Sequence, residues 1–506
     1  MQVIRGPARI LPQFFRSATA HPPPGLRKCV PSREPCFLSS VLTTVNAKLI
    51  LPPSFAPAPV FRNINLLRSI DLTKPYSKEV ISVIVENVSK EGQTEYYMPF
   101  AADEVTKVSF FEAGDKKAPF GEFKVDEVEF DPQSPTQYYR ILLTEPLAPG
   151  NQITLQVAIG KTTVVEPIPA EIEQVEKQFL QWTGTQYVAS AYVTDKQKTK
   201  LKLPNNEAPE FTKLTAKSDG TSDPTKVGSA FTYGPYEDVK PSSGAGKTVK
   251  IRYEYTHPVI VMEKLTRDIE VSHWGGNIAF EEKYVMTNAA AKLKNQFSRV
   301  KWAAASYYGP PTSAIKALTY NLKVGSIGPY FTDEIGNVST SRFRSNMRES
   351  HLEIKPRYPV FGGWNYTFTL GWNHDLREFV RAKPNGEDFV LRVPLLEGPK
   401  EPVVYGDVEI RVILPEGATD VKYSSPIPII GEEHFLHKTF MDTIGRTAFK
   451  LRFSNVVDEQ HHKELIVTYH LPKTAGFRKP FVIFTALSTV FVFSWIVSKI
   501  DVRIGK

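Results

Sequence analysis

Apolar and polar residues alternate along much of this chain. In residues 248–255, Val249, Ile251 and Tyr253 alternate with charged or hydroxyl-bearing residues. A strand with this period has one face in the core and one in water, which is typical of antiparallel sheets in β-sandwiches. The same alternation occurs in three further segments, 154–159, 407–412 and 449–453. More continuously apolar runs at 80–85 and 464–469 predict central strands.

Helical periodicity is rare before the C-terminus. Residues 171–182 place Ile172, Val175 and Phe179 on one helical face, and Gly184 follows as a stop signal. A second helix is expected near 312–322. The 40 prolines favour loop-rich β domains over helical bundles. We therefore predict a mainly β fold with a few helices.

The longest uncharged apolar run, residues 480–498, lies near the C-terminus. As a helix it would be about 28 Å long, close to the hydrocarbon thickness of a bilayer. Trp495, near one end, is a residue type that favours the membrane interface. A buried core helix is the alternative. The run is predicted to be one transmembrane helix.

Composition suggests five segments. Residues 204–246 are rich in Gly, Ser, Pro, Asp and Lys without a sustained period, and are expected to form a linker or a long surface loop. The predicted organisation is listed in chain order: a leader (1–47), a first β domain ending in that loop (48–246), a second β domain (247–479), the transmembrane helix (480–498) and a short tail (499–506).

The leader has three interpretations. Its modest apolar run ends at Ala47, which fits a secretory signal cleaved after that residue, whereas residues 1–33 carry basic but no acidic residues, as in mitochondrial presequences. An incompletely defined start is the third. The leader holds six basic residues and one acidic residue, which supply most of the net charge of +8, so a nucleic-acid partner is not expected. Both cysteines, Cys29 and Cys36, also lie there, so a processed chain would lack thiols.

Three Asn-x-Ser/Thr sequons follow the leader, at Asn87, Asn337 and Asn365. Each lies beside a turn-forming glycine, and each is a candidate N-glycosylation site if the domains are lumenal. The alternative is that they are unmodified polar turn residues.

Motifs for catalysis are not evident. The chain has no His-Glu-x-x-His, no Gly-x-Ser-x-Gly and no phosphate-binding loop. Four histidines are paired in sequence, but neither pair offers a third metal ligand: His434 with His437, and His461 with His462. The carboxylate pairs Glu281–Glu282 and Asp333–Glu334 are expected to be solvated turn residues. No catalytic residue, metal site or cofactor is predicted.

Several longer strings resemble the ribophorin I family. They include Ile-Glu-Val-Ser-His-Trp-Gly at 269–275, Asp-Glu-Ile-Gly-Asn-Val-Ser-Thr-Ser at 333–341 and Pro-Arg-Tyr-Pro-Val-Phe-Gly-Gly-Trp at 356–364. Further matches occur at 63–75, 413–418 and 442–446. The resemblance extends from about residue 60 to the membrane helix.

This resemblance implies a non-catalytic structural subunit of the oligosaccharyltransferase, the enzyme of the endoplasmic reticulum that transfers a lipid-linked oligosaccharide to Asn-x-Ser/Thr. It implies a single-pass type I protein of the endoplasmic reticulum membrane, in which both β domains are lumenal and the short tail is cytosolic. The expected partners are the catalytic and small membrane subunits, with nascent polypeptides as a further candidate. Asn337 corresponds to a family glycosylation position. The weak leader and the short, fungal-like tail depart from the animal pattern. Two alternatives are a tail-anchored cytosolic scaffold and a metallopeptidase-like hydrolase.

Overall fold

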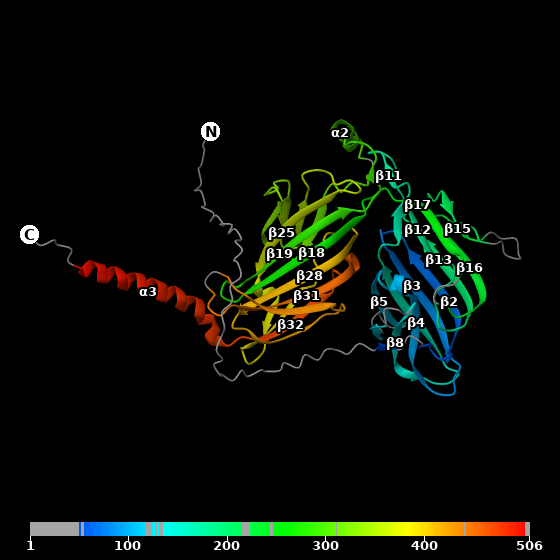
Figure 1. The fold of residues 1–506 in the computed structure, drawn as a ribbon, viewed down its shortest axis with the longest axis horizontal. Coiled ribbons are helices and arrows are strands. Elements are labelled where there is room, and N and C mark those ends of the chain that lie inside the picture. The colour runs from blue at the N-terminus through cyan, green and yellow to red at the C-terminus, as the bar shows by residue number, and fades with distance from the viewer. Residues whose placement is uncertain are drawn as a thin grey trace, which may run out of the picture. The chain divides into compact units, whose positions relative to one another are not determined.

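The computed structural model describes residues 50–51, 55–116, 123–127, 129–130, 135–214, 223–242, 246–309, 311–439 and 442–500 (Figure 1). The predictions for the leader, its cleavage site after Ala47 and its two cysteines lie outside these residues, as does most of the predicted tail. The described chain is mainly β, as the alternation predicts.

The N-terminal half is built on a seven-stranded sheet of order β15-β16-β13-β2-β3-β9-β5. All its neighbours are antiparallel except β2 and β13, which are parallel. Its strands are β2 (Phe61–Asp71), β3 (Ser77–Asn87), β5 (Val108–Asp115), β9 (Gln152–Lys161), β13 (Thr194–Lys202), β15 (Thr225–Val227) and β16 (Ala230–Val239).

Two smaller sheets complete this half. Core clusters join one end of the large sheet to the sheet β4-β8-β6 and the other end to the sheet β10-β12-β17-β14. Their strands are β4 (Gln93–Ala101), β6 (Lys124–Glu127), β8 (Thr136–Leu147), β10 (Val165–Pro167), β12 (Phe179–Thr185), β14 (Glu210–Phe211) and β17 (Thr248–Glu254).

The C-terminal half repeats the plan with a seven-stranded sheet of order β22-β25-β19-β18-β28-β31-β30. Only β18 and β28 pair in parallel within it. Its strands are β18 (Ile260–Ser272), β19 (Asn277–Asn288), β22 (Ile327–Asp333), β25 (Asn365–Asp375), β28 (Val403–Glu416), β30 (Gly431–His437) and β31 (Arg446–Val457).

One core cluster joins this sheet to two smaller antiparallel sheets, β21-β24-β23 and β26-β27-β32-β29. Their strands are β21 (Leu318–Leu322), β23 (Arg342–Ser345), β24 (Ser350–Ile354), β26 (Val380–Ala382), β27 (Asp388–Pro394), β29 (Thr419–Ser424) and β32 (Glu464–His470). The remaining elements are short, apart from α2 and α3: β1 (Ile50–Leu51), β7 (Glu129–Phe130), β11 (Glu171–Ile172), β20 (Lys292–Leu293), α1 (Ala102–Val105), α2 (Arg299–Tyr308), α3 (Arg478–Lys499), and the 3-10 turns Leu376–Glu378, Asp458–Gln460 and Lys473–Phe477.

Every strand predicted from alternation or from an apolar run is present, whereas both helices predicted before residue 480 are wrong. In 171–182, Val175 is exposed, while Leu180 and Trp182 are buried in β12, which pairs with β17. Near 312–322, residues 318–322 form β21, and the helix of this region is α2, which begins after the Ser298 cap. Pairing with a neighbouring strand overrides a short helical period.

The segment 204–246 is not a linker where the structure describes it. Strands β14, β15 and β16 lie within it and pair with β17 or β13. It has no visible period because its strands are short or are interrupted by residues such as Gly234 and Pro235. The division between domains at residue 246 stays a prediction; strand β17, which follows it, pairs with β12 and β14.

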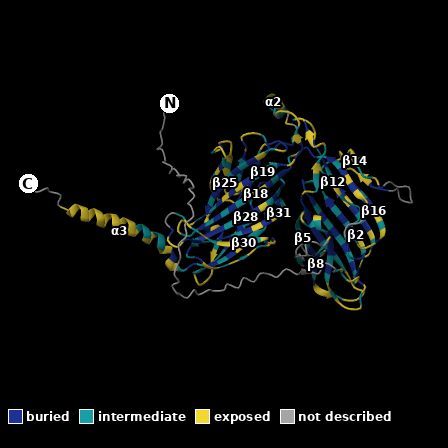
Figure 2. Cartoon of the chain, viewed as in Figure 1, coloured by how far each residue is buried: buried dark blue, intermediate teal, exposed yellow. Residues whose placement is uncertain are grey.

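Helix α3 confirms the helix predicted for 480–498. Its mean hydropathy reaches 2.1 over an 18-residue window, and none of its residues is buried (Figure 2). A core helix would be enclosed by side chains, so that alternative is wrong. Twenty-two residues give a length of about 33 Å, enough to cross a bilayer.

Candidate functional sites

The Asn337 sequon lies on an exposed turn that follows β22. The turn is fixed by Asp333, whose carboxylate accepts hydrogen bonds from the backbone N–H groups of Ile335 and Gly336, both at 3.0 Å, and from the Tyr366 hydroxyl at 3.1 Å. Val338, beside the sequon asparagine, is 5% exposed and anchors the turn in the core. Asn337 itself is exposed.

Arg357 completes this turn from a distant segment. Its guanidinium pairs with Asp333 and donates to the carbonyl oxygens of Gly336 at 3.2 Å and Asn337 at 2.9 Å. The hydrogen bond from Arg357 lowers the pKa of Asp333 to about 2. The strings at 333–341 and 356–364 are therefore in contact, and together they hold the exposed sequon in a defined turn. The expectation that Asp333 is a solvated turn residue is wrong, because its side chain is only 4% exposed.

The other two sequons differ from each other. Asn365 begins β25, is exposed, and accepts a hydrogen bond from Thr287 at 3.0 Å through its side-chain oxygen. Asn87 ends β3 and is 1% exposed. Its amide nitrogen donates to the carbonyl oxygens of Glu91 at 2.8 Å and Leu147 at 2.6 Å. This nitrogen is the atom that a glycan would modify, so the fold uses Asn87 as a turn residue.

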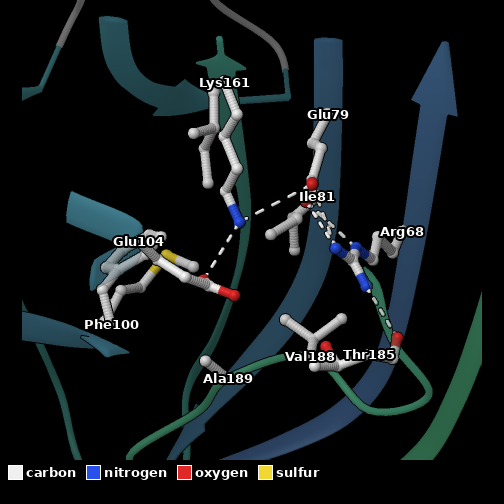
Figure 3. A pocket seen from close by; sticks show the side chains of 11 residues that line it. Arg68, Glu79, Ile81, Phe100, Glu104, Lys161, Thr185, Val188 and Ala189 are labelled. Atoms are coloured by element: carbon white, nitrogen blue, oxygen red, sulfur yellow. Dashed lines mark hydrogen bonds and ion pairs between the residues drawn. The ribbon is translucent and has the colours of Figure 1, made fainter. Parts of the chain in front are cut away.

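A charged pocket lies between the sheets of the N-terminal half (Figure 3). Arg68 of β2 donates two hydrogen bonds of 3.0 Å to Glu79 of β3 and one of 3.1 Å to the carbonyl oxygen of Thr185. Lys161 of β9 lies 3.7 Å from Glu79 and 3.2 Å from Glu104 of α1. Burial opposes ionisation of Glu79, but the charges of Arg68 and Lys161 outweigh it, and the pKa of the carboxyl is lowered.

Two cations and two anions balance in this pocket, so it holds three strands and α1 together rather than providing a base. The alternation pattern alone does not predict it. The available signal was that Glu79 shares the strand face of the buried Ile81 and Val83, where an ionisable residue is unusual.

A second buried charge lies in the C-terminal half. Arg267 of β18 and Glu282 of β19 are both 0% exposed and form an ion pair. Tyr284 donates to Glu282 at 2.5 Å, and Glu397 lies 3.7 Å from Arg267. Burial raises the pKa of Glu397 to about 7. The expectation that Glu282 is a solvated turn residue is wrong.

The paired histidines do not converge on a metal site. His434 and His437 are three residues apart in β30, so their side chains point to opposite faces. His461 lies 3.0 Å from the Tyr405 hydroxyl, and burial lowers its pKa to about 4, whereas His462 is exposed. Over the ranges described above, no three His, Cys, Asp or Glu residues are grouped as metal ligands.

The chain matches known proteins over nearly all of the residues that form these sheets and α3. The family model described as Ribophorin I matches residues 61–498. A relative from Schizosaccharomyces pombe, dolichyl-diphosphooligosaccharide–protein glycosyltransferase subunit 1, is 32% identical, with 85% of this chain and 93% of the relative covered. Subunit 1B from Arabidopsis thaliana is 31% identical, with 90% and 97% covered.

Among solved structures, an M1 zinc metallopeptidase from Deinococcus radiodurans matches with 11% identity and a TM-score of 0.24, covering 41% of this chain and 42% of that one. So low a score supports no comparison of fold or activity. The family match instead includes the three strings at 269–275, 333–341 and 356–364, and ends within α3. This chain belongs to the ribophorin I family.

Proposed function

We propose that this chain is a structural subunit of an oligosaccharyltransferase complex, which transfers an oligosaccharide from dolichyl diphosphate to asparagine in Asn-x-Ser/Thr. The observation that carries the proposal is the extent of the match: the family model covers residues 61–498, and two relatives named as subunit 1 or 1B of this glycosyltransferase are matched over 93% and 97% of their own length. A shared domain would align over part of the chain, whereas a shared role in an assembly constrains the whole of it.

The proposed role is non-catalytic. Transfer from a lipid-linked donor requires a divalent cation held by carboxylates beside the membrane. Residues 480–498 carry no carboxylate, and the two acidic side chains at the base of α3 already have partners: Asp442 pairs with Lys479 at 3.3 Å, and Glu416 accepts a hydrogen bond from the backbone N–H of Ile444 at 2.7 Å. The β-rich halves would therefore support a catalytic subunit and contact acceptor polypeptides near it.

The proposed topology is single-pass type I in the endoplasmic reticulum membrane, with residues 48–479 in the lumen. The exposed Asn337 and Asn365 support it, because both are presented as acceptors would be. The test is protease protection in intact microsomes. Resistance of this segment to added protease, lost when detergent is added, is the expected result; digestion without detergent would favour the tail-anchored cytosolic scaffold.

Helix α3 offers one face for packing against the membrane helices of partner subunits. Thr485, Ser488 and Thr489 line a shallow groove on it with larger apolar residues. Thr485 and Thr489 donate to carbonyl oxygens one turn earlier, at 2.9 and 2.8 Å, so their hydroxyl groups need no partner in lipid. Small residues on one face permit close helix approach.

Co-purification tests the proposal and this face together. The tagged full-length chain, extracted in mild detergent, is expected to bring down the catalytic subunit. Ser488→Leu fills the groove and should reduce recovery of membrane subunits, whereas the control Ser494→Leu, outside the groove lining, should not. Absence of every other transferase subunit from the wild-type sample would contradict the proposed function.

A further inference from the structure

The base of α3 is held against the C-terminal half by buried and charged contacts. Ala475, three residues before α3, is 8% exposed and belongs to the core cluster. A Cβ atom added to Gly417 would lie 3.1 Å from the Ala475 methyl group, so the chain passes close to the end of β28. Lys479, in the first turn of α3, forms an ion pair of 3.3 Å with Asp442. The point at which α3 leaves the sheets is therefore fixed.

Trp274 lies beside this point. It occupies the turn between β18 and β19 and lines a pocket together with Gly476 and Lys479. The turn therefore lies level with the first turn of α3. Trp274 belongs to the string at 269–275, which contains none of the sequons and none of the residues of the buried ion pairs described above.

Two further apolar side chains share this level. Phe477 immediately precedes α3, and Ile444 lies in the loop that holds Asp442, with its backbone N–H donating to Glu416 at 2.7 Å. Glu416 lines the same pocket as Trp274. The exposed fractions are 63% for Trp274, 72% for Phe477 and 57% for Ile444. We call these three residues the juxtamembrane patch.

Cationic groups accompany the patch. Lys473, Arg478 and Lys479 lie within seven residues of one another at the base of α3. Lys473 is exposed, whereas Arg478 and Lys479 are half-buried, and the Nη1 atom of Arg478 is enclosed by protein. Exposed aromatic and basic side chains side by side are the combination found where proteins meet the lipid headgroup layer.

We propose that the juxtamembrane patch contacts the headgroup layer of the bilayer that α3 spans, with Trp274 as its principal anchor. A bilayer is the occupant because α3 is continuous with the patch: whichever surface α3 enters must lie at the level of its first turn. The inference rests on the proposed membrane insertion of α3, and the experiment separates the two.

The experiment measures the depth of single nitroxide labels in the full-length chain, reconstituted in phosphatidylcholine vesicles. The only two cysteines, Cys29 and Cys36, are replaced by serine, and one cysteine is introduced at a time. Trp274→Cys is the test position and Phe491→Cys reports insertion of α3. Met347→Cys is the matched control, since Met347 is 97% exposed in a different turn. Electron paramagnetic resonance compares collisions with oxygen, which partitions into lipid, and with a water-soluble nickel chelate.

The ratio of oxygen to nickel collisions at position 274 is expected to be several-fold above that at 347 and below that at 491. Equal ratios at 274 and 347, with a high ratio at 491, would overturn the patch but leave the proposed function intact. Low ratios at all three positions would overturn both. As a second readout, a photocrosslinker at 274 in the native complex should label lipid; labelling of a protein subunit instead would also overturn the patch.

Discussion

Replacing Arg267 tests how much the buried charges of the C-terminal half matter. In Arg267→Met, the carboxylate of Glu282 stays fully enclosed and loses its cation, while Glu397 loses a neighbouring charge. Breaking a buried pair in this way costs about 3–5 kcal/mol. Arg267 also stacks on Phe280, with its guanidinium 4.9 Å from the ring centre, and methionine keeps part of that contact. The loss is therefore mainly electrostatic.

The assay is thermal unfolding of the full-length chain in detergent, followed by tryptophan fluorescence. At about 2–4 °C per kcal/mol for a domain of this size, Arg267→Met should lower Tm by roughly 6–20 °C. The neighbouring pair provides a matched control. Arg411 of β28 pairs with Asp268, the residue that follows Arg267 in β18, but the two side chains are 37% and 24% exposed, so Arg411→Met should cost only about 0–1 kcal/mol.

A double variant gives the decisive comparison. Adding Glu282→Leu to Arg267→Met removes the isolated carboxylate, so the double variant should be more stable than Arg267→Met alone. Strictly additive losses in the double variant, or equal effects of Arg267→Met and Arg411→Met, would refute the reasoning that burial controls the cost.

Three other predictions concern the sequons and acid stability. Asn337→Gln and Asn365→Gln should each remove one endoglycosidase-sensitive band shift, whereas a shift lost in Asn87→Gln would contradict its buried amide. Asp333→Asn should increase proteolysis at the Asn337 turn while lowering the free energy of unfolding by less than about 2 kcal/mol. Because the pKa of Asp333 is lowered to about 2, proteolysis of this turn in the wild type should also increase as pH falls from about 4 towards 2. No such increase would argue against the contact between Asp333 and Arg357. The pKa of His461 is lowered to about 4, so between about pH 6.5 and pH 4 the unfolded chain binds one more proton than the folded chain. The free energy of unfolding should therefore fall on acidification, by up to about 1.4 kcal/mol per pH unit. His461→Gln should reduce this slope in denaturant titrations.

Alternation was a reliable guide to the strands because each has one buried face. In β17, Val249, Ile251 and Tyr253 are buried while Thr248 and Lys250 are exposed, as the period of two predicts. The parallel pairs β2–β13 and β18–β28 could not be predicted, because pairing partners far apart in sequence leave no local signal. Helix α2 was not predicted because its apolar residues do not recur with the 3.6-residue period of a helix that buries one face.

The sites were predictable in part. Asn337 and Arg357 lie in strings that the sequence analysis singled out, but only the fold shows that one string holds the other. Glu79 and Glu282 carry a weaker signal, because an acidic residue on a buried strand face is visible once the strand and its phase are known. Their cations come from adjacent strands, which a sequence does not identify.

The contacts at the base of α3 have a mechanical consequence. Leu471 and Ala475 are already in the core, and Lys479 is held by Asp442, so no flexible stalk separates the last strand from the bilayer. Any tilt or rotation of α3 is therefore transmitted directly to β28 and to the loop before β31. The sheets and α3 then move together as one rigid unit, and the distance of the sheets from the lipid depends on the contacts of Leu471, Ala475 and Lys479.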